Sequence, residues 1–152
     1  MALILETADA IEAWVEKEIA VTDWVCVTQE HIQLFAESTG DRQWIHTDVE
    51  RARRESPFGT TVAHGFLTLS LLSHFLEQAV EIRGVRMAIN YGLNRVRFPS
   101  PVRANSLVRA RFRLQTVKKT ADSMEAVFSV LVEEQGITKP CCAAEWIVRY
   151  FQ

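Results

Sequence analysis

The most apolar part of the chain runs from Gly65 to about Ile82. Apolar residues occupy nearly all sides of a helical wheel in this stretch, which predicts a buried helix that follows His64. A second helical pattern ends at Gly40, and Thr28 is a suitable N-cap for it. The pattern therefore predicts one long central helix and one shorter helix before it.

After Gly84 the pattern changes to short alternations of apolar and polar residues, which predict strands. We expect strands at residues 86–97, 106–118, 124–134 and 141–151. Consecutive strands favour antiparallel pairing, and a helix buried on one face of the sheet would supply the core. Because no linker or repeat divides the chain, we expect one α+β domain spanning residues 1–152.

Shorter elements and loops are expected in the rest of the chain. They are a helix capped by Thr7 or Asp9 and reaching about Ile19, a strand at residues 21–27, a helix at residues 48–54 capped by Thr47 or Asp48, and a loop at residues 55–63.

Composition indicates an ordinary soluble protein, with 48% hydrophobic and 24% charged residues. A net charge of −2 argues against nucleic acid or an anionic membrane as a general partner. No apolar run approaches the ~20 residues that cross a bilayer, and the N-terminus lacks the basic region of a signal peptide. The three cysteines show neither disulfide nor metal-ligand spacing. We therefore expect a cytoplasmic protein that binds no metal and no redox cofactor.

Arginine is concentrated between residues 95 and 113, at Arg95, Arg97, Arg103, Arg109, Arg111 and Arg113. Their alternation through much of this run favours one solvated face of a strand. A local anion site, for instance for a phosphorylated ligand, remains the alternative.

Candidate chemistry appears at residues 38–46, Ser-Thr-Gly-Asp-Arg-Gln-Trp-Ile-His, which form a predicted loop. Asp41 and His46 are each, taken singly, more often turn, surface or capping residues than catalysts. A carboxylate and a neutral imidazole can nevertheless hold one water molecule together and accept its proton. The pair is therefore a candidate for adding or removing water beside a carbonyl group.

The His64-Gly65 pair adds a second candidate feature at the start of the central helix. A backbone N–H at a helix N-terminus can stabilise a developing negative charge on oxygen, and Gly65 would let a thioester approach the backbone closely. We expect His64 to cap or orient the helix start rather than to act directly in catalysis.

Three segments resemble the MaoC-like dehydratases, the (R)-specific enoyl-CoA hydratases of the hot-dog superfamily. They are Phe35-Ala-Glu-Ser-Thr-Gly-Asp41 with Ile45-His46, Val62-Ala-His-Gly-Phe-Leu-Thr-Leu-Ser70 and Val96-Arg-Phe-Pro-Ser-Pro-Val102. The resemblance implies a hot-dog fold, in which an antiparallel sheet wraps around a long central helix, and usually a homodimer.

The same resemblance implies roles for individual residues. It implies Asp41 and His46 as the catalytic dyad that activates water and Gly65 as the oxyanion donor. Ser73 matches a serine that supports the acidic residue in some members, and Arg97 and Arg103 are candidates to contact CoA phosphates. The implied substrate is an acyl-CoA or an acyl carrier protein thioester, with no cofactor.

The chain departs from the family pattern between the two dyad residues. The usual run is Gly-Asp-x-Asn-Pro-aliphatic-His, whereas Arg42-Gln43-Trp44-Ile45 stands here. Gln43 still offers an amide, on a side chain one methylene longer than that of asparagine. The absence of the proline removes a rigid turn. Trp44 can narrow or line the acyl pocket. This variant is similar to a subgroup that includes nodulation-protein-N-like proteins.

These observations predict a hydro-lyase that reversibly adds water to trans-2-enoyl-CoA to give (R)-3-hydroxyacyl-CoA. Two alternatives remain open. A hot-dog acyl-CoA thioesterase would typically carry an acidic residue on the central helix, which has only Glu77 near its end. A non-catalytic acyl-thioester-binding protein would agree with the altered loop.

Overall fold

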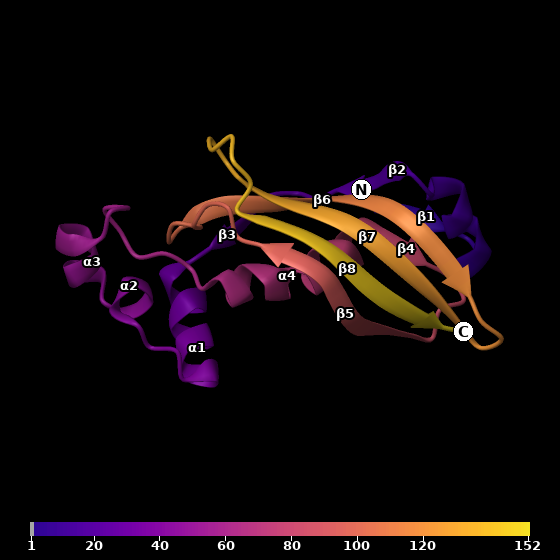
Figure 1. Cartoon of the computed structure of the whole chain (residues 1–152), viewed down its shortest axis with the longest axis horizontal. Helices are drawn as coiled ribbons and strands as arrows, with labels where there is room; N and C mark the ends of the chain where they lie inside the picture. Colours follow the sequence, from indigo (N-terminus) through magenta and orange to yellow (C-terminus); the bar gives the residue numbers. More distant parts are fainter. Residues whose placement is uncertain (1) are drawn as a thin grey trace.

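A strongly curved antiparallel sheet arches over one helix in this protein (Figure 1). The structure, a computed structural model, describes residues 2–152. Its elements are, in chain order, β1 (Leu3–Leu5), the 3-10 helix η1 (Ala8–Trp14), β2 (Lys17–Val21), β3 (Val25–Val27), α1 (Gln29–Thr39), α2 (Trp44–Thr47), α3 (Val49–Glu55), α4 (Gly65–Ala79), β4 (Val80–Ile82), β5 (Met87–Arg97), β6 (Ser106–Lys119), β7 (Ser123–Glu134) and β8 (Cys142–Phe151).

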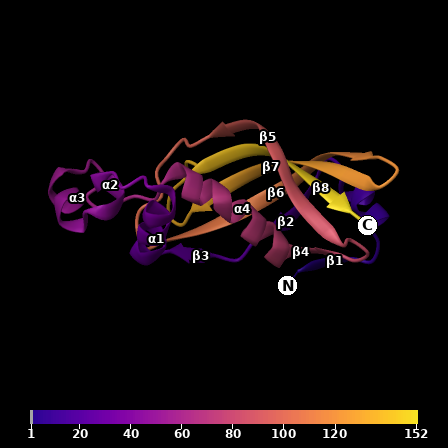
Figure 2. The same cartoon turned by 90° about the horizontal axis from the view of Figure 1, so that it is seen from below.

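The sheet has six strands, in the order β2-β6-β7-β8-β5, with β3 also paired to β6. All of its pairings are antiparallel. Helix α4 crosses the concave face of the sheet, while α1, α2 and α3 project beyond one end of it (Figure 2). This arrangement confirms the predicted α+β class and the hot-dog fold.

The core lies between α4 and the concave face of the long strands. Burial alternates along β7 and β8, as expected for strands with one covered face. Phe112, Phe128 and Trp146 form an aromatic cluster with ring centroids 6.2 to 6.4 Å apart. Phe75 and Leu72 of α4 are buried in the same core. These contacts hold α4 against the concave face of the sheet.

Local signals predicted α1 and α3 well. The Thr28 side chain accepts a hydrogen bond from the His31 N–H at 3.1 Å, and α1 ends at Gly40, whose φ is +80°. The Asp48 side chain caps α3 by accepting a hydrogen bond from the Arg51 N–H at 2.9 Å. The four long strands also match their predicted ranges to within one or two residues.

Two helix predictions and one strand prediction were wrong in part. The helix expected to reach Ile19 is only the short η1, because residues 17–21 pair with β6 as strand β2. The strand expected at residues 21–27 is interrupted, since β2 ends at Val21 and β3 begins at Val25. The central helix ends at Ala79, and the next three residues form β4, which pairs in parallel with β1. Pairing with distant segments overrides local helical spacing at these positions.

The central helix is also less buried than its apolar wheel predicted. Five of its residues are buried, whereas Phe66 is 71% exposed. The sheet covers only one flank of α4, so apolar side chains on its other flanks reach the surface. Its 15 residues make it the longest described helix, and none of the helices in residues 2–152 is long and apolar enough to cross a membrane.

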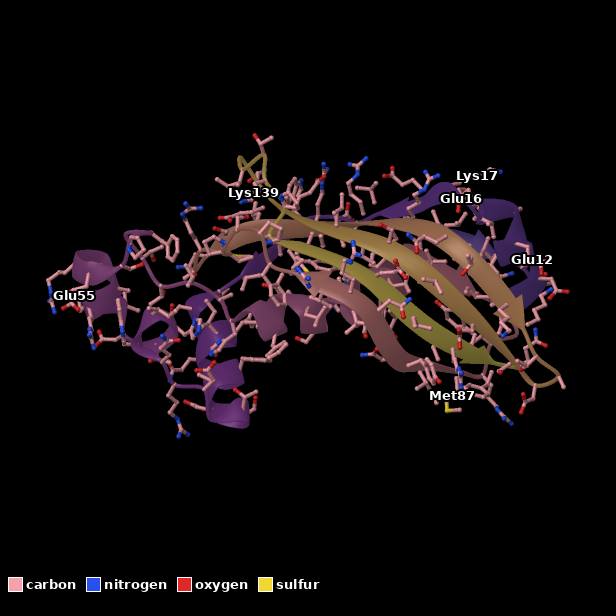
Figure 3. The ribbon with its side chains drawn as sticks, viewed as in Figure 1. Glu12, Glu16, Lys17, Glu55, Met87 and Lys139 are labelled. Carbon is pink, nitrogen blue, oxygen red and sulfur yellow. The ribbon has the colours of Figure 1, made fainter. Side chains whose placement is uncertain are left out.

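The outer face of the sheet carries ion pairs between neighbouring strands. Arg109 pairs with Glu133 at 2.9 Å, Arg111 with Glu18 at 3.1 Å and Arg113 with Glu16 at 3.1 Å. Figure 3 shows Glu16 and Lys17 together on this outer surface. These pairs confirm the interpretation of this part of the arginine run as a solvated strand face.

Candidate active site

The loop after α1 begins with a tight turn that presents Asp41. Its N–H donates to Thr39 Oγ1 and its Oδ1 accepts from the Gln43 N–H, both at 3.4 Å. The prediction of a loop through residue 46 was wrong at its end, because the short helix α2 begins at Trp44; it carries His46 inward, where it is only 7% exposed. The turn and the one-turn helix therefore leave the carboxylate at the surface and bury the imidazole.

The orientation of His46 is set by the backbone of a distant segment. Its Nδ1 lies 2.6 Å from the carbonyl oxygen of Val62. A carbonyl oxygen only accepts hydrogen bonds, so Nδ1 carries the proton and Nε2 of the neutral ring keeps its lone pair. Val62 is itself held by a hydrogen bond from its N–H to the Ile45 carbonyl at 3.0 Å. This tautomer gives His46 a free basic nitrogen.

Burial is the main electrostatic influence on His46. Desolvation lowers its pKa below the ordinary value of 6.5, and the neighbouring His64 lowers it further. The hydrogen bond to Val62 and the charge of Asp41 act in the opposite direction. Because the net shift is downward, His46 is neutral near neutral pH and able to accept a proton.

His64 packs directly against His46. The two rings stack with centroids 3.8 Å apart and an interplanar angle of 24°. His64 Nε2 lies 2.9 Å from the backbone carbonyl oxygen of Asp41, and the ring of Phe35 covers another side with a centroid distance of 4.9 Å. The structure thus brings Asp41, His46 and His64 into one cluster.

This cluster is also the group of described side chains that comes nearest to a metal site. One oxygen of Asp41 and one ring nitrogen of each histidine lie within 4.8 Å of one another. The lone pairs of stacked imidazoles lie in two nearly parallel planes, whereas a single ion requires lone pairs that converge on it. The arrangement therefore suits hydrogen bonds to a water molecule better than coordination of an ion.

Gly65 begins α4 beside this cluster, at the end where free N–H groups and the helix dipole favour negative charge. A Cβ built on Gly65 would lie 3.0 Å from Cδ2 of Phe98. A side chain at position 65 would therefore press on an aromatic ring that packs against this backbone, a contact that the sequence did not reveal.

Other predicted site residues occupy separate places. Trp44 lies under the guanidinium of Arg51, 4.4 Å from its ring centroid, so it packs on α3. The hydrogen-bond partners of Asp41 within residues 2–152 are Thr39, Gln43 and His64, so Ser73 does not support the carboxylate by a hydrogen bond. Ser73 instead lines a cavity two turns further along α4.

The two candidate phosphate contacts differ in their surroundings. Arg97 is exposed at the end of β5, and its guanidinium donates to the Val96 carbonyl at 2.7 Å. Arg103 lies 3.6 Å from the carboxylate of Glu134, a buried residue, so part of its charge is neutralised. Arg97 is therefore the freer of the two cations.

Cavities flank α4 on both sides. Between its C-terminal half and strands β5 and β8 lies a cavity of about 480 Å³, bounded by the buried side chains of Trp146 and Tyr150. A smaller one of about 190 Å³ begins at Phe66 and shares Ser73 and Trp146 with it. We call these two together the seam cavity.

A groove of about 690 Å³ lies on the other flank of α4, against α1 and β3. Its lining is mostly apolar and includes Phe35, Leu67 and Leu71. Phe35 therefore separates this groove from the His64 ring, which it contacts.

An antiparallel sheet around one helix, with an acid and an imidazole beside that helix's N-terminus, defines a hot-dog protein with a site suited to water chemistry. The chain belongs to the MaoC-like dehydratase family, since the model of the family's MaoC like domain matches residues 11–135. It is accordingly a hydro-lyase.

Two relatives support this assignment along nearly the whole chain. 3-Hydroxyacyl-thioester dehydratase Z of Mycobacterium tuberculosis is 49% identical over 146 residues, which cover 95% of this chain and 96% of the relative. Nodulation protein N of Rhizobium leguminosarum bv. viciae is 44% identical over 145 residues, covering 94% and 89%. Both confirm the family resemblance, including its link to nodulation-protein-N-like proteins.

A solved structure supports the fold. The unliganded R-hydratase of Pseudomonas aeruginosa superimposes with a TM-score of 0.70 at 22% identity, over 91% of this chain and 82% of that one.

Proposed function

We propose that the protein reversibly hydrates trans-2-enoyl-CoA to (R)-3-hydroxyacyl-CoA, with Asp41 and His46 as the catalytic dyad. The observation that carries the proposal is the orientation of His46, whose Nδ1–H is engaged by Val62 and whose Nε2 is free, in one cluster with the Asp41 carboxylate. The stereochemistry rests on the fold shared with an R-hydratase, and the thioester on the dehydratase relative.

In the hydration direction the dyad holds one water molecule between a carboxylate oxygen and His46 Nε2. The water oxygen bonds to C3 of the enoyl group while one of its protons passes to the dyad. The π bond between C2 and C3 breaks, and its electrons move to form an enolate on the thioester oxygen. The Gly65 N–H at the start of α4 stabilises that oxygen, and the dyad delivers the proton taken from water to C2, which restores the thioester. Dehydration follows the same steps in reverse.

The acyl chain has a suitable place in the seam cavity. The cavity begins at Phe66, next to the proposed oxyanion donor, and its distal part is lined by apolar side chains such as Leu76 and Val148. Trp146 bounds it within the core. Apolar burial of this kind favours an alkyl chain by about 0.8 kcal/mol per CH₂. Arg97 and Arg103 are the proposed contacts of the CoA phosphates.

The proposed partner is a second copy of the chain. Strand β5 is an edge strand, and Met87, Ile89, Tyr91 and Leu93 along it are exposed. Figure 3 shows Met87 pointing away from the sheet. Exposed edges that carry apolar residues favour pairing with another strand. Sedimentation or light scattering in solution tests for the dimer.

A cytoplasmic location belongs to the same proposal.

Hydration of crotonyl-CoA, followed by the loss of conjugated thioester absorbance, tests the activity. We expect Asp41→Asn and His46→Gln each to lower kcat/KM by about 10²- to 10⁴-fold, the usual contribution of acid–base groups. Glu37→Gln, on the exposed side of α1, is the matched control and should retain activity. Undiminished turnover in both dyad variants would rule out the dyad. Release of free CoA from a saturated acyl-CoA would favour a thioesterase instead.

A further inference from the structure

His64 has no capping role, although it occupies the N-cap position of α4. Its side chain makes no capping hydrogen bond to the helix. It is 4% exposed and turns toward the loop, where Nε2–H donates to the Asp41 carbonyl and the ring stacks on His46. A buried histidine with these contacts acts on the dyad rather than on the helix.

We propose that His64 is a positioning residue that brings Asp41 and His46 to the same water molecule. The proposal rests on the proposed function for its catalytic meaning. Its structural content is that one short segment, residues 62–64, holds both members of the dyad. The Val62 carbonyl accepts from His46 Nδ1–H, and the His64 ring donates to the backbone of Asp41.

This segment is itself rigidly attached to the fold. The Ala63 N–H donates to the Val102 carbonyl at 2.7 Å, and the Ala104 N–H donates to the Thr61 carbonyl at 3.0 Å. An antiparallel bridge joins Val62 to Arg103. The segment before β6 therefore helps to fix the positions of both dyad residues, which do not depend on their own loop alone.

The contact with His64 matters most for Asp41, whose loop has few other restraints. The hydrogen bonds of Asp41 to Thr39 and Gln43 are long, at 3.4 Å each, and the turn lacks the family's proline. At 2.9 Å, the bond from His64 is the shortest hydrogen bond that Asp41 makes within residues 2–152. Without it the carboxylate could move relative to His46.

The stacked ring also acts on the charge of His46. Two imidazoles 3.8 Å apart repel each other when both are protonated, and this repulsion contributes to the lowered pKa of His46. Asp41 is the other charged group that acts on His46, and it acts in the opposite direction. His64 Nδ1 is buried without a partner among residues 2–152.

Two variants separate the two contacts. His64→Phe keeps a ring against His46 but loses the donor to Asp41, whereas His64→Gln keeps an N–H near the position of Nε2 but loses the ring. We expect His64→Phe to lower kcat for crotonyl-CoA by about 10- to 100-fold with little change in KM, as for other orienting groups. His64→Gln should restore part of this loss. His74→Gln, an exposed histidine on α4, is the matched control and should be unchanged.

Nitrogen NMR of the imidazoles gives a readout that needs no substrate. In the wild type we expect the Nδ1–H tautomer of His46. In His64→Gln, where a polar uncharged side chain replaces the neighbouring imidazole, we expect the pKa of His46 to rise because that imidazole no longer repels its charge. The Asp41 amide signal should shift or broaden in His64→Phe and less in His64→Gln. Circular dichroism verifies that both variants fold.

The outcomes distinguish the two proposals. Unchanged His46 titration and unchanged Asp41 signals in both folded variants would overturn the positioning role, even with an active wild type. A wild type that hydrates no enoyl thioester, together with the expected NMR changes, would overturn the proposed function and leave the positioning role intact. If neither variant folds, the same signals in His64→Asn decide the question, because its shorter amide loses both the ring against His46 and the reach to the Asp41 carbonyl.

Discussion

The Nδ1 of His46 lies 2.6 Å from the carbonyl oxygen of Val62, a residue of the segment just before α4. This contact fixes the tautomer of a buried imidazole that lies in one cluster with Asp41 and His64 and leaves its Nε2 free to accept a hydrogen bond. A backbone carbonyl therefore performs the orienting function that a carboxylate performs for many catalytic histidines.

The pH dependence of hydration follows from the burial of His46. Burial disfavours the imidazolium, so the pKa lies below 6.5, and the basic form persists as the pH falls to that value. We expect kcat/KM to be constant from pH 8 to about pH 6.5 and to fall only at lower pH, through the lowered pKa. A pH profile with an acid limb centred above 6.5 would contradict this expectation.

The stability of the fold should share that dependence. His46 has a depressed pKa in the folded chain, so the unfolded chain binds its proton at a higher pH. Its contribution to stability is complete above pH 6.5 and is lost as the pH falls toward the folded pKa. Urea unfolding at several pH values measures the free energy of unfolding. In His46→Gln this free energy should fall less steeply below pH 6.5 than in the wild type.

Gly65→Ala should separate activity from stability. The added Cβ would press on the ring of Phe98, which is 41% exposed and therefore able to move. We expect the free energy of unfolding to change by less than about 1 kcal/mol, since alanine also favours the helix by a similar amount. Activity should fall because the displaced ring borders the proposed oxyanion donor. Restoration of activity by adding Phe98→Leu would support this cause, whereas full activity of Gly65→Ala alone would contradict it.

Gly40→Ala tests the turn that presents Asp41. Gly40 has φ of +80°, with no atom near its missing Cβ, so the cost is one of backbone conformation. We expect a loss of about 1–2 kcal/mol in the free energy of unfolding. Gly40→Asn should lose less, because asparagine tolerates this conformation. Equal losses in the two variants, measured by chemical denaturation, would count against the conformational explanation.

Chain-length preference distinguishes the two cavities beside α4. Ala88 lines the distal part of the seam cavity, so Ala88→Phe should reduce the space for long acyl chains. We expect kcat/KM for an eight-carbon substrate to fall at least 10-fold, because a few of its CH₂ groups can no longer be buried in the cavity. The four-carbon substrate should be little affected. Leu71→Phe, in the groove against α1, is the matched control. A length-dependent loss in Leu71→Phe alone would move the acyl chain to that groove.

Several elements could be predicted because their signals are local. The caps Thr28 and Asp48, the left-handed Gly40 and the alternating strands after Gly84 each act over a few neighbouring residues. Strands β2 and β4 could not, because each exists through pairing with a segment far away in the chain.

The candidate site divides in the same way. The motifs identified Asp41, His46 and Gly65 and placed them at loop and helix termini, since spacing along the chain is visible in the sequence. The contacts of Val62 with His46, of His64 with Asp41 and of Phe98 with Gly65 appeared only in the folded chain.

The sequence by itself determined the family and the sheet around a central helix, and it predicted the chemical groups of the candidate site. Only the tertiary structure decided which imidazole nitrogen is free, which residue holds the Asp41 backbone and how much of α4 remains exposed. The physical reason is that caps, turns and periodicity depend on covalent neighbours. The protonation and orientation of a buried side chain depend instead on atoms that folding brings to it.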